Sequence, residues 1–294
     1  MSFFTEPLAF EFFRRGLLAA TLVGGLTGLV GVFVVLRRMS YIGHGMSHAV
    51  FGGAVVGYVA GINFYVAAGL WGFISALLIN QTTRRQQIAA DAAIGIVTTA
   101  SFAVGVAIIS RARSITQNFD AALFGNLLAV TETDLVVIAS VFALTLAVVF
   151  FAYKQLLFLT FDPEVAPVYG VRAGWLDSLF ALVLAATIIA SIRIMGVTLI
   201  AASLVIPPVV ARLVTDRFAH MLILSTCLGA VLGFFGLFVS YQFDIASGAS
   251  IVLLSAATFA AVLVTVIARE WFRTGRLSIG NRGMGSAERE AVLD

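Results

Sequence analysis

Residues 16–36 read GLLAATLVGGLTGLVGVFVVL, an apolar stretch that contains no charged side chain. About 20 such residues form a helix long enough to cross the hydrocarbon core of a bilayer. Gly24 and Gly28 lie four positions apart in this stretch, so they share one helix face and allow another helix to approach closely. The stretch therefore predicts a membrane-spanning helix that packs tightly against a neighbour.

Apolar stretches of this kind recur along the whole chain. The 294 residues are 61% hydrophobic and 11% charged, whereas soluble domains carry roughly a quarter charged residues. We therefore predict an all-α polytopic membrane protein without a soluble domain. The sixth and seventh candidate spans are separated only by Arg193 and Gly196, so eight and nine transmembrane helices both fit. The spans are placed near residues 16–36, 40–60, 64–82, 91–110, 135–153, 175–193, 195–213, 220–241 and 249–268.

The 18 lysines and arginines predict how these helices are oriented. Most of them fall on the inner side if the N-terminus faces outside and the C-terminus faces the cytoplasm. The net charge of +3 fits such membrane flanks and not a nucleic-acid surface. We therefore expect the lipid bilayer as a partner and expect no nucleic acid. We expect a transmembrane domain over residues 1–273 and a polar, disordered cytoplasmic tail over residues 274–294.

Two histidines lie four residues apart near the start of the second span. His44 and His48 therefore share one helix face, one turn apart, and the chain contains only one other histidine, His220. Imidazoles are costly to bury in lipid and are common ligands of transition metals, so the pair predicts a metal site inside the membrane. The alternative is that both histidines only form hydrogen bonds between helices.

The same span continues with glycines at a spacing of four. Gly53, Gly57 and Gly61 predict a face that packs closely against another helix. We expect this packing to place the histidine helix inside the bundle rather than against lipid.

A punctuated loop lies between the fifth and sixth spans, on the predicted inner side. Asp162 suits a helix N-cap, Pro163 suits the first helical position, and Gly170 suits the end of a short helix. Glu164 adds a second acidic side chain to this loop. The pattern predicts a short surface helix over residues 162–170, which is either an ordinary capped loop or a docking helix for a cytoplasmic partner.

Two further features lie within spans. Asp91 begins the fourth span, where the helix macrodipole favours an acidic residue, and a gating role is the alternative. Pro207 and Pro208 are expected to kink or break the seventh span, either as a local irregularity or as a hinge along the transport path. The chain lacks the phosphate-binding loop motif and the zinc-protease motif, so we expect neither ATP hydrolysis by this chain nor enzymatic activity.

Five short segments stand out in order along the chain. They are FVVLRRMSYIG at 33–43 with SHA at 47–49, DAAIGI at 91–96, LFGNLLAV at 123–130, FDPE at 161–164 and GASIVL at 248–253. Each fragment alone is modest, but their order and spacing across roughly residues 14–268 resemble the permease subunits of the manganese, zinc and iron ABC importers.

This resemblance implies a fold like that of the type II ABC importer permeases and a place in a prokaryotic cell membrane. It implies a homodimer, or a heterodimer with a sister permease, that works with two cytoplasmic ATPase subunits and an extracytoplasmic metal-binding protein. The transported ion would be manganese, zinc or iron, with no cofactor bound by the chain itself. The loop helix at 162–170 would be the coupling helix that docks on the ATPase.

The resemblance places the family's metal site at positions 44 and 48, and the chain departs from its relatives there. Relatives usually carry Asp at the position of His44. Imidazole suits zinc and iron, whereas carboxylates suit manganese, so this departure makes manganese a less natural ligand. Pro167 lies inside the expected coupling helix and removes a backbone donor, so that helix is expected to be short or bent.

Two other functions remain open from the residues. The chain could act alone as a secondary metal transporter or channel that uses the same histidines. It could also be a structural or receptor-like membrane protein in which the histidines only pack. The metal and the composition of the dimer are not fixed by the sequence.

Overall fold

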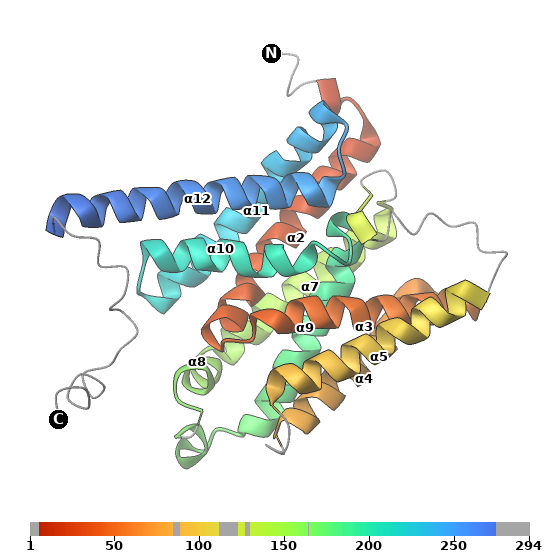
Figure 1. Ribbon diagram of the computed structural model, residues 1–294, viewed down its shortest axis with the longest axis horizontal. Helices are drawn as coiled ribbons and strands as arrows, with labels where there is room; N and C mark the ends of the chain where they lie inside the picture. Colours follow the sequence, from red (N-terminus) through yellow and green to blue (C-terminus); the bar gives the residue numbers. More distant parts are fainter. Residues whose placement is uncertain (1–5, 85–88, 112–122, 127–129, 164, 275–294) are drawn as a thin grey trace.

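The computed structural model describes residues 6–84, 89–111, 123–126, 130–163 and 165–274 (Figure 1). These residues form helices and connecting turns without any strand, and seven helices are long and apolar enough to cross a membrane. The prediction of an all-α polytopic membrane protein is confirmed. The tail from residue 275 onward, predicted to be disordered, lies outside the described residues. The elements are α2 Glu11–Leu36, α3 Ser40–Val59, α4 Phe64–Arg84, α5 Ala90–Arg111, α7 Glu132–Phe151, α8 Tyr153–Phe161, η2 Ala166–Tyr169, α9 Ala173–Met195, α10 Ile200–Val214, α11 Phe218–Phe243 and α12 Ser247–Thr274.

Each expected span corresponds to one helix in the described part of the chain. The sixth and seventh spans are separate helices, α9 and α10, because Gly196 follows α9 with a φ of 73° that helical residues do not adopt. α3 and α10 are not among the seven helices that meet the length and apolarity expected of a span. α10 has only 15 residues, and α3 carries His44 and His48 among its apolar residues.

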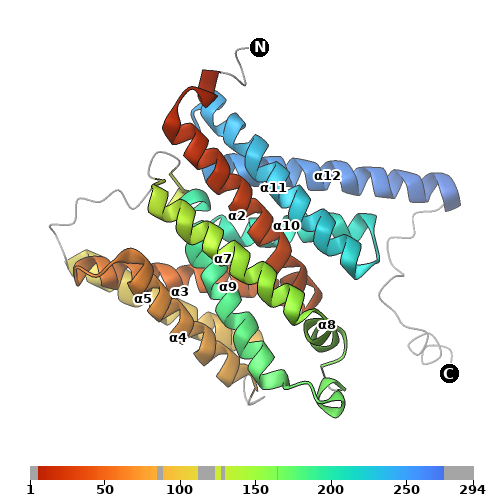
Figure 2. The same cartoon turned by 180° about the vertical axis from the view of Figure 1, so that it is seen from behind.

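The α2 helix lies at the centre of the bundle. In its most apolar window 78% of the residues are buried, compared with 11% for α12, which lies at the periphery. Figure 2 shows α2 flanked by α11 and α7, and both helices pack against it. Gly24 and Gly28 of α2 meet the backbone of α11 at Gly229 and Ser225, where an added Cβ would collide with backbone atoms. The first apolar stretch is therefore buried by direct backbone contact between two helices.

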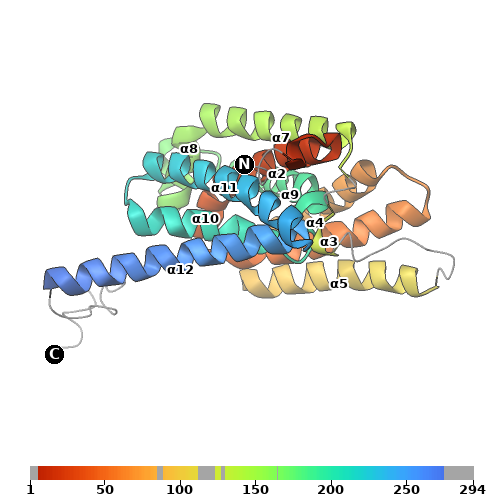
Figure 3. The same cartoon turned by 90° about the horizontal axis from the view of Figure 1, so that it is seen from above.

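The histidine helix α3 lies on the opposite side of the molecule from α7. It packs against α4, α5, α9 and α10, and the four helices α12, α10, α3 and α5 form a row in which each contacts the next. Figure 3 shows α5 and α12 along one face of the molecule and α7 along the other. α3 is thus covered by several helices, whereas α5 and α12 expose most of their surface.

The glycines of α3 divide into two kinds. Gly53 and Gly57 face α4, where an added Cβ would collide with Trp71 and Ala67. Gly61 does not belong to this packing face, contrary to the prediction. It follows the helix C-cap Ala60 with a φ of 67°, and no described neighbouring atom lies within 4 Å of an added Cβ. Its role is to turn the chain after the helix.

α10 continues through its two prolines, so the break expected at Pro207 and Pro208 does not occur. Pro208 has no N–H and cannot donate to the Leu204 carbonyl in the usual helical pattern. That carbonyl oxygen instead packs against Gly31 of α2, which has no side chain to keep it away. The close contact between the two helices accommodates the prolines without interrupting α10.

Candidate metal centre

His44 and His48 lie on the same face of α3, one turn apart. Their ring centres are 4.6 Å apart and their planes meet at 84°, so the edge of one imidazole meets the face of the other. Both residues are half-buried. The Nδ1 atom of His48 is buried and has no hydrogen-bond partner among the described residues. A buried ring nitrogen that lacks a partner costs free energy on folding, whichever tautomer the imidazole adopts.

Aromatic rings surround the two histidines. Phe102 of α5 stands edge-on to His48, with ring centres 4.9 Å apart, and Tyr41 lies 5.9 Å from His44 on α3 itself. Ser47, between the two histidines, donates its hydroxyl to the His44 carbonyl at 2.8 Å and so satisfies itself within the helix. The described neighbours of the imidazoles are therefore two aromatic rings, of which Tyr41 also carries a hydroxyl, and a serine that is paired within the helix.

Two glycines beside the histidines allow neighbouring helices to approach. An added Cβ at Gly43 would lie 2.9 Å from the Leu204 side chain of α10. One at Gly45 would lie 2.7 Å from Ile94 and 3.0 Å from Thr98, both on α5. These glycines fix α3 between α5 and α10, so the orientation of the histidine face is set by packing on both sides.

One chain supplies only two of these nitrogen ligands. In the part of the chain whose side chains the structure describes, no three His, Cys, Asp or Glu residues gather where they could hold a metal ion. His220, the third histidine, lies exposed on α11. A site with the usual four ligands would therefore need groups beyond the two imidazoles that the described residues supply.

Asp91 lies in the first turn of α5, as its sequence position predicted. Ile94, one turn further along α5, packs against the histidine helix at Gly45. The backbone of Asp91 is therefore near the same end of α3, while its side chain lies outside what the structure describes.

The loop between α8 and α9 contains a helix that is shorter than predicted. The helix η2 is a single 3₁₀ turn, Ala166–Tyr169, with Pro167 in its first turn. Asp162 caps the end of α8 and not the start of the new helix, and Pro163 precedes η2 instead of opening it. Gly170 ends η2 with a φ of 77°, in agreement with the prediction. Glu164 lies outside the described residues.

This loop carries large apolar side chains that are not covered by the rest of the chain. Val168 is 82% exposed and Tyr169 is 70% exposed, and Phe161 at the end of α8 is 60% exposed. Phe158 and Tyr169 contact each other with ring centres 5.4 Å apart, which joins α8 to η2. The exposed residues around η2 form an apolar surface on a compact turn.

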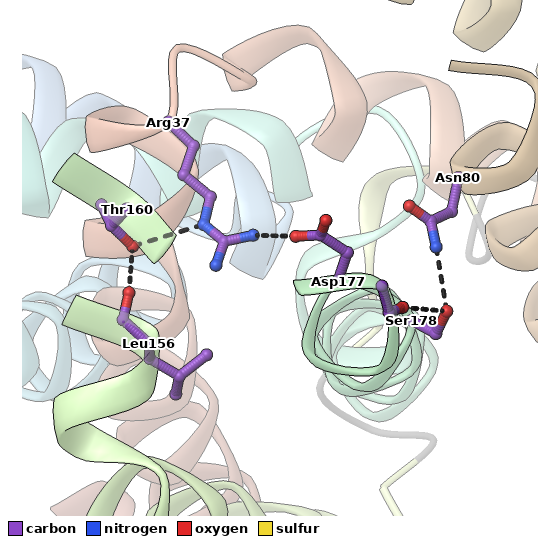
Figure 4. A network of polar contacts seen from close by, with 7 residues as sticks. Arg37, Asn80, Leu156, Thr160, Asp177 and Ser178 are labelled. Atoms are coloured by element: carbon purple, nitrogen blue, oxygen red, sulfur yellow. Dashed lines mark hydrogen bonds and ion pairs between the residues drawn. The ribbon is translucent and has the colours of Figure 1, made fainter. Parts of the chain in front are cut away.

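Two polar clusters were not predicted from the sequence. At one end of the bundle, Arg37 forms an ion pair with Asp177 at 3.0 Å (Figure 4). At another, the carboxylate of Asp134 is buried, accepts a hydrogen bond from the Tyr65 hydroxyl and lies 3.4 Å from Arg193. Lone acidic residues within apolar spans were the available signal, since such groups are expensive in a membrane unless they are paired.

The capping box at the start of α7 was a further signal for the second cluster. Thr131 accepts a hydrogen bond from the Asp134 backbone, and the Asp134 carboxylate accepts one from the Thr131 backbone at 2.7 Å. The spacing Thr-x-x-Asp before an apolar run is typical of a helix start. The cluster ties α4, α7 and α9 together.

Comparison with known proteins identifies the family. The model of the ABC 3 transport family matches residues 9–266 of the chain. The chain belongs to the ABC 3 transport family. The resemblance to permease subunits of the metal ABC importers, drawn from five sequence segments, is thereby confirmed. As a permease, the chain is a membrane-spanning subunit and not an enzyme.

Individual relatives agree along nearly the whole permease. The chain is 36% identical over 258 residues to the manganese transport system membrane protein MntC of Halalkalibacterium halodurans, covering 88% of each chain. It is 33% identical over 258 residues to a Haemophilus influenzae protein whose name assigns it to an iron transport system, covering 88% of this chain and 95% of that one. The solved structure of PsaBC from Streptococcus pneumoniae in complex with Fab superposes with a TM-score of 0.83 at 31% identity, covering 94% of this chain and 99% of that one.

Proposed function

We propose that this permease imports a divalent transition metal ion by alternating access, driven by ATP hydrolysis in separate ATPase subunits. His44 and His48, from this chain and from a second permease, bind the ion briefly on its way through the membrane. The observation that carries the proposal is the pair of imidazoles on α3, whose ring centres are 4.6 Å apart and of which one buried nitrogen has no hydrogen-bond partner in the described part of the chain. The names of two relatives, one for manganese and one for iron, support a metal as the transported species.

The second permease is needed because transport requires more ligands than one chain offers. Two imidazoles per copy give a shared site of four nitrogen ligands when two copies meet, or a mixed site when the partner is a sister permease. A weak and transient site suits transport, because a closed tetrahedral set would retain zinc. Asp91 and the proline pair of α10, Pro207 and Pro208, lie on the two helices that flank α3, and we assign them to the path that opens and closes around it.

The ligand type indicates which metals are favoured. Imidazole nitrogens suit zinc and iron, whereas manganese prefers carboxylate and other oxygen ligands. Because His44 stands where relatives usually carry Asp, we infer that zinc or iron binds this permease more tightly than manganese does.

The partners follow from the family and from the loop surface. We assign residues 162–170 as the docking segment for a cytoplasmic ATPase subunit, because Val168 and Tyr169 present apolar surface on a short rigid turn. The distribution of lysines and arginines supports a cytoplasmic location for this segment and for the C-terminus. An extracytoplasmic metal-binding protein then delivers the ion to the other face.

Reconstitution in lipid vesicles tests this function. The permease, its ATPase subunits and its metal-binding protein are expected to accumulate Zn²⁺ or Fe²⁺ only when ATP is supplied. The permease alone is the control, and no flux is expected from it. Metal flux through the permease alone would support the stand-alone transporter or channel instead. The absence of zinc, iron and manganese flux in the full assembly would contradict the proposal.

Restoring the acid that relatives carry is expected to change the metal preference. His44→Asp replaces a nitrogen ligand by a carboxylate, which favours manganese over zinc. The ratio of Mn²⁺ to Zn²⁺ uptake is expected to rise about tenfold, the effect of about 1.4 kcal/mol in relative binding. Competition between the two ions in the same vesicles measures this ratio. An unchanged ratio would show that position 44 does not contact the ion.

A further inference from the structure

Arg37 stands directly after the end of α2 and is almost completely covered. Its side chain is 9% exposed. One guanidinium nitrogen, Nη1, donates to Asp177 at 3.0 Å, and Nε donates to the Thr160 hydroxyl at 3.3 Å (Figure 4). The guanidinium carbon also lies 4.6 Å from the centre of the Phe180 ring. Arg37 is therefore held on several sides by elements far from it in sequence.

The partners of Arg37 lie on the two stems of the docking segment. Thr160 is in the last turn of α8, which leads into that segment, and Asp177 is near the start of α9, which follows it. Arg37 itself is joined to the histidine helix by a short connection, because α3 begins at Ser40 and His44 lies one turn further on. One guanidinium thus connects both ends of the docking segment to the start of the helix that carries the histidines.

We propose that Arg37 is a positioning residue that transmits movement of the docking segment to α3. This inference rests on the proposed function, since it requires that the segment docks on an ATPase and that α3 moves in response to ATP. The two bonds of Arg37 keep α8 and α9 in register with residues 37–40, so displacement of either stem displaces the first turn of α3.

The electrostatics of Arg37 suit a residue that changes partners. Burial lowers the pKa of its guanidinium, and attraction to Asp177 opposes that shift. The third nitrogen, Nη2, is buried and has no hydrogen-bond partner among the described residues. A shift of the stems that brings an acceptor to Nη2 would therefore gain a charge-assisted hydrogen bond.

A neighbouring hydrogen bond provides a matched control. Asn80 of α4 donates to the Ser178 hydroxyl at 3.0 Å, on the same turn of α9 as Asp177 (Figure 4). It joins α9 to α4 but does not reach α8 or the connection to α3. Asn80→Ala therefore removes a polar contact of α9 without touching the proposed link, and Arg38→Gln removes the adjacent, exposed arginine.

The experiment follows cysteine labelling in the permease assembled with its ATPase subunits. Cys227→Ser removes the native cysteine. A cysteine introduced by Val168→Cys reports docking, since this position is 82% exposed without the partner. One introduced by Tyr41→Cys, 52% exposed in the first turn of α3, reports movement of the histidine helix. Labelling rates are measured with and without ATP trapped by vanadate.

The expected result is loss of transmission without loss of docking. The ATP-dependent change in labelling at Tyr41→Cys is expected to fall about tenfold in Arg37→Gln and in Asp177→Asn. In the controls Asn80→Ala and Arg38→Gln, the same change in labelling is expected to stay within about twofold of the reference. Protection of Val168→Cys by the ATPase is expected to persist in every variant. If Arg37 had a purely structural role, its substitution would lower assembly and thermal stability. The response at Tyr41→Cys, relative to the protection of Val168→Cys, would then stay as it is in the reference.

Other outcomes separate this inference from the function on which it rests. An unchanged response at Tyr41→Cys in Arg37→Gln would overturn it. Should the charged variants fail to fold, Thr160→Val removes one of the two bonds without uncovering a charge, and an unchanged response there would overturn it equally. No protection of Val168→Cys in the reference would overturn both the docking segment and this inference. Absence of metal uptake with intact labelling responses would contradict only the proposed function.

Discussion

Replacing His48 by alanine is expected to reduce metal uptake by at least about 100-fold, because even indirect support of a metal ligand is worth roughly 10–100-fold in affinity. The buried Nδ1 atom of His48 has no hydrogen-bond partner among the residues that the structure describes, and the His48 ring is held edge-on to His44 and Phe102. Removing the imidazole takes two of the four proposed nitrogen ligands from a symmetric pair of permeases. Uptake of Zn²⁺ by reconstituted vesicles measures the effect.

His220→Ala is the matched control for this loss. It removes the one other histidine of the chain from an exposed position on α11, so uptake is expected to stay unchanged. Both variants are expected to insert and to assemble with the ATPase equally well, as measured by co-purification. If His48→Ala and His220→Ala accumulate metal at the same rate, the α3 histidines do not bind the transported ion.

Placing a charge on the docking segment is expected to detach the ATPase. Val168 is 82% exposed on η2, and Val168→Asp would require an unpaired carboxylate to enter an apolar contact. An uncompensated charge in such a contact costs about 2 kcal/mol or more, so the affinity for the ATPase subunit is expected to fall by about 30-fold or more. Co-purification and ATPase binding by titration measure the change.

The control for this variant lies at the other end of the bundle. Phe243 is 70% exposed at the end of α11, and Phe243→Asp introduces the same charge on a comparably exposed apolar side chain. ATPase binding is expected to remain intact there. Equal weakening by both substitutions would indicate a general loss of stability, and unchanged binding in Val168→Asp would place the docking surface elsewhere.

Most of the architecture could be predicted because it depends on properties local to each segment. Apolar length defines a membrane helix, so every expected span appears as a helix, and Gly196 separates α9 from α10 as a positive-φ residue. The helix at the docking segment is shorter than predicted because Pro167 and the end of α8 limit it to one 3₁₀ turn.

The remaining features depend on contacts between distant segments, which no local pattern encodes. The close approach of α10 to α2 at Leu204 and Pro208 depends on the absence of a side chain at Gly31, in a different helix. The pairing of Arg37 with Asp177 likewise joins positions that are 140 residues apart. At the candidate site, helical spacing predicted that His44 and His48 share a face, but the unpaired Nδ1 atom and the contact with Phe102 could only be seen in three dimensions.

The backbone contact between α2 and α11 has a mechanical consequence. Where Gly24 and Gly28 touch Gly229 and Ser225, no flexible side chain lies between the two helices to absorb a sliding motion. We therefore expect this pair to travel as one rigid unit while the permease changes conformation. The displacement that exposes the ion to alternate sides would then fall on the looser, more peripheral helices that surround α3.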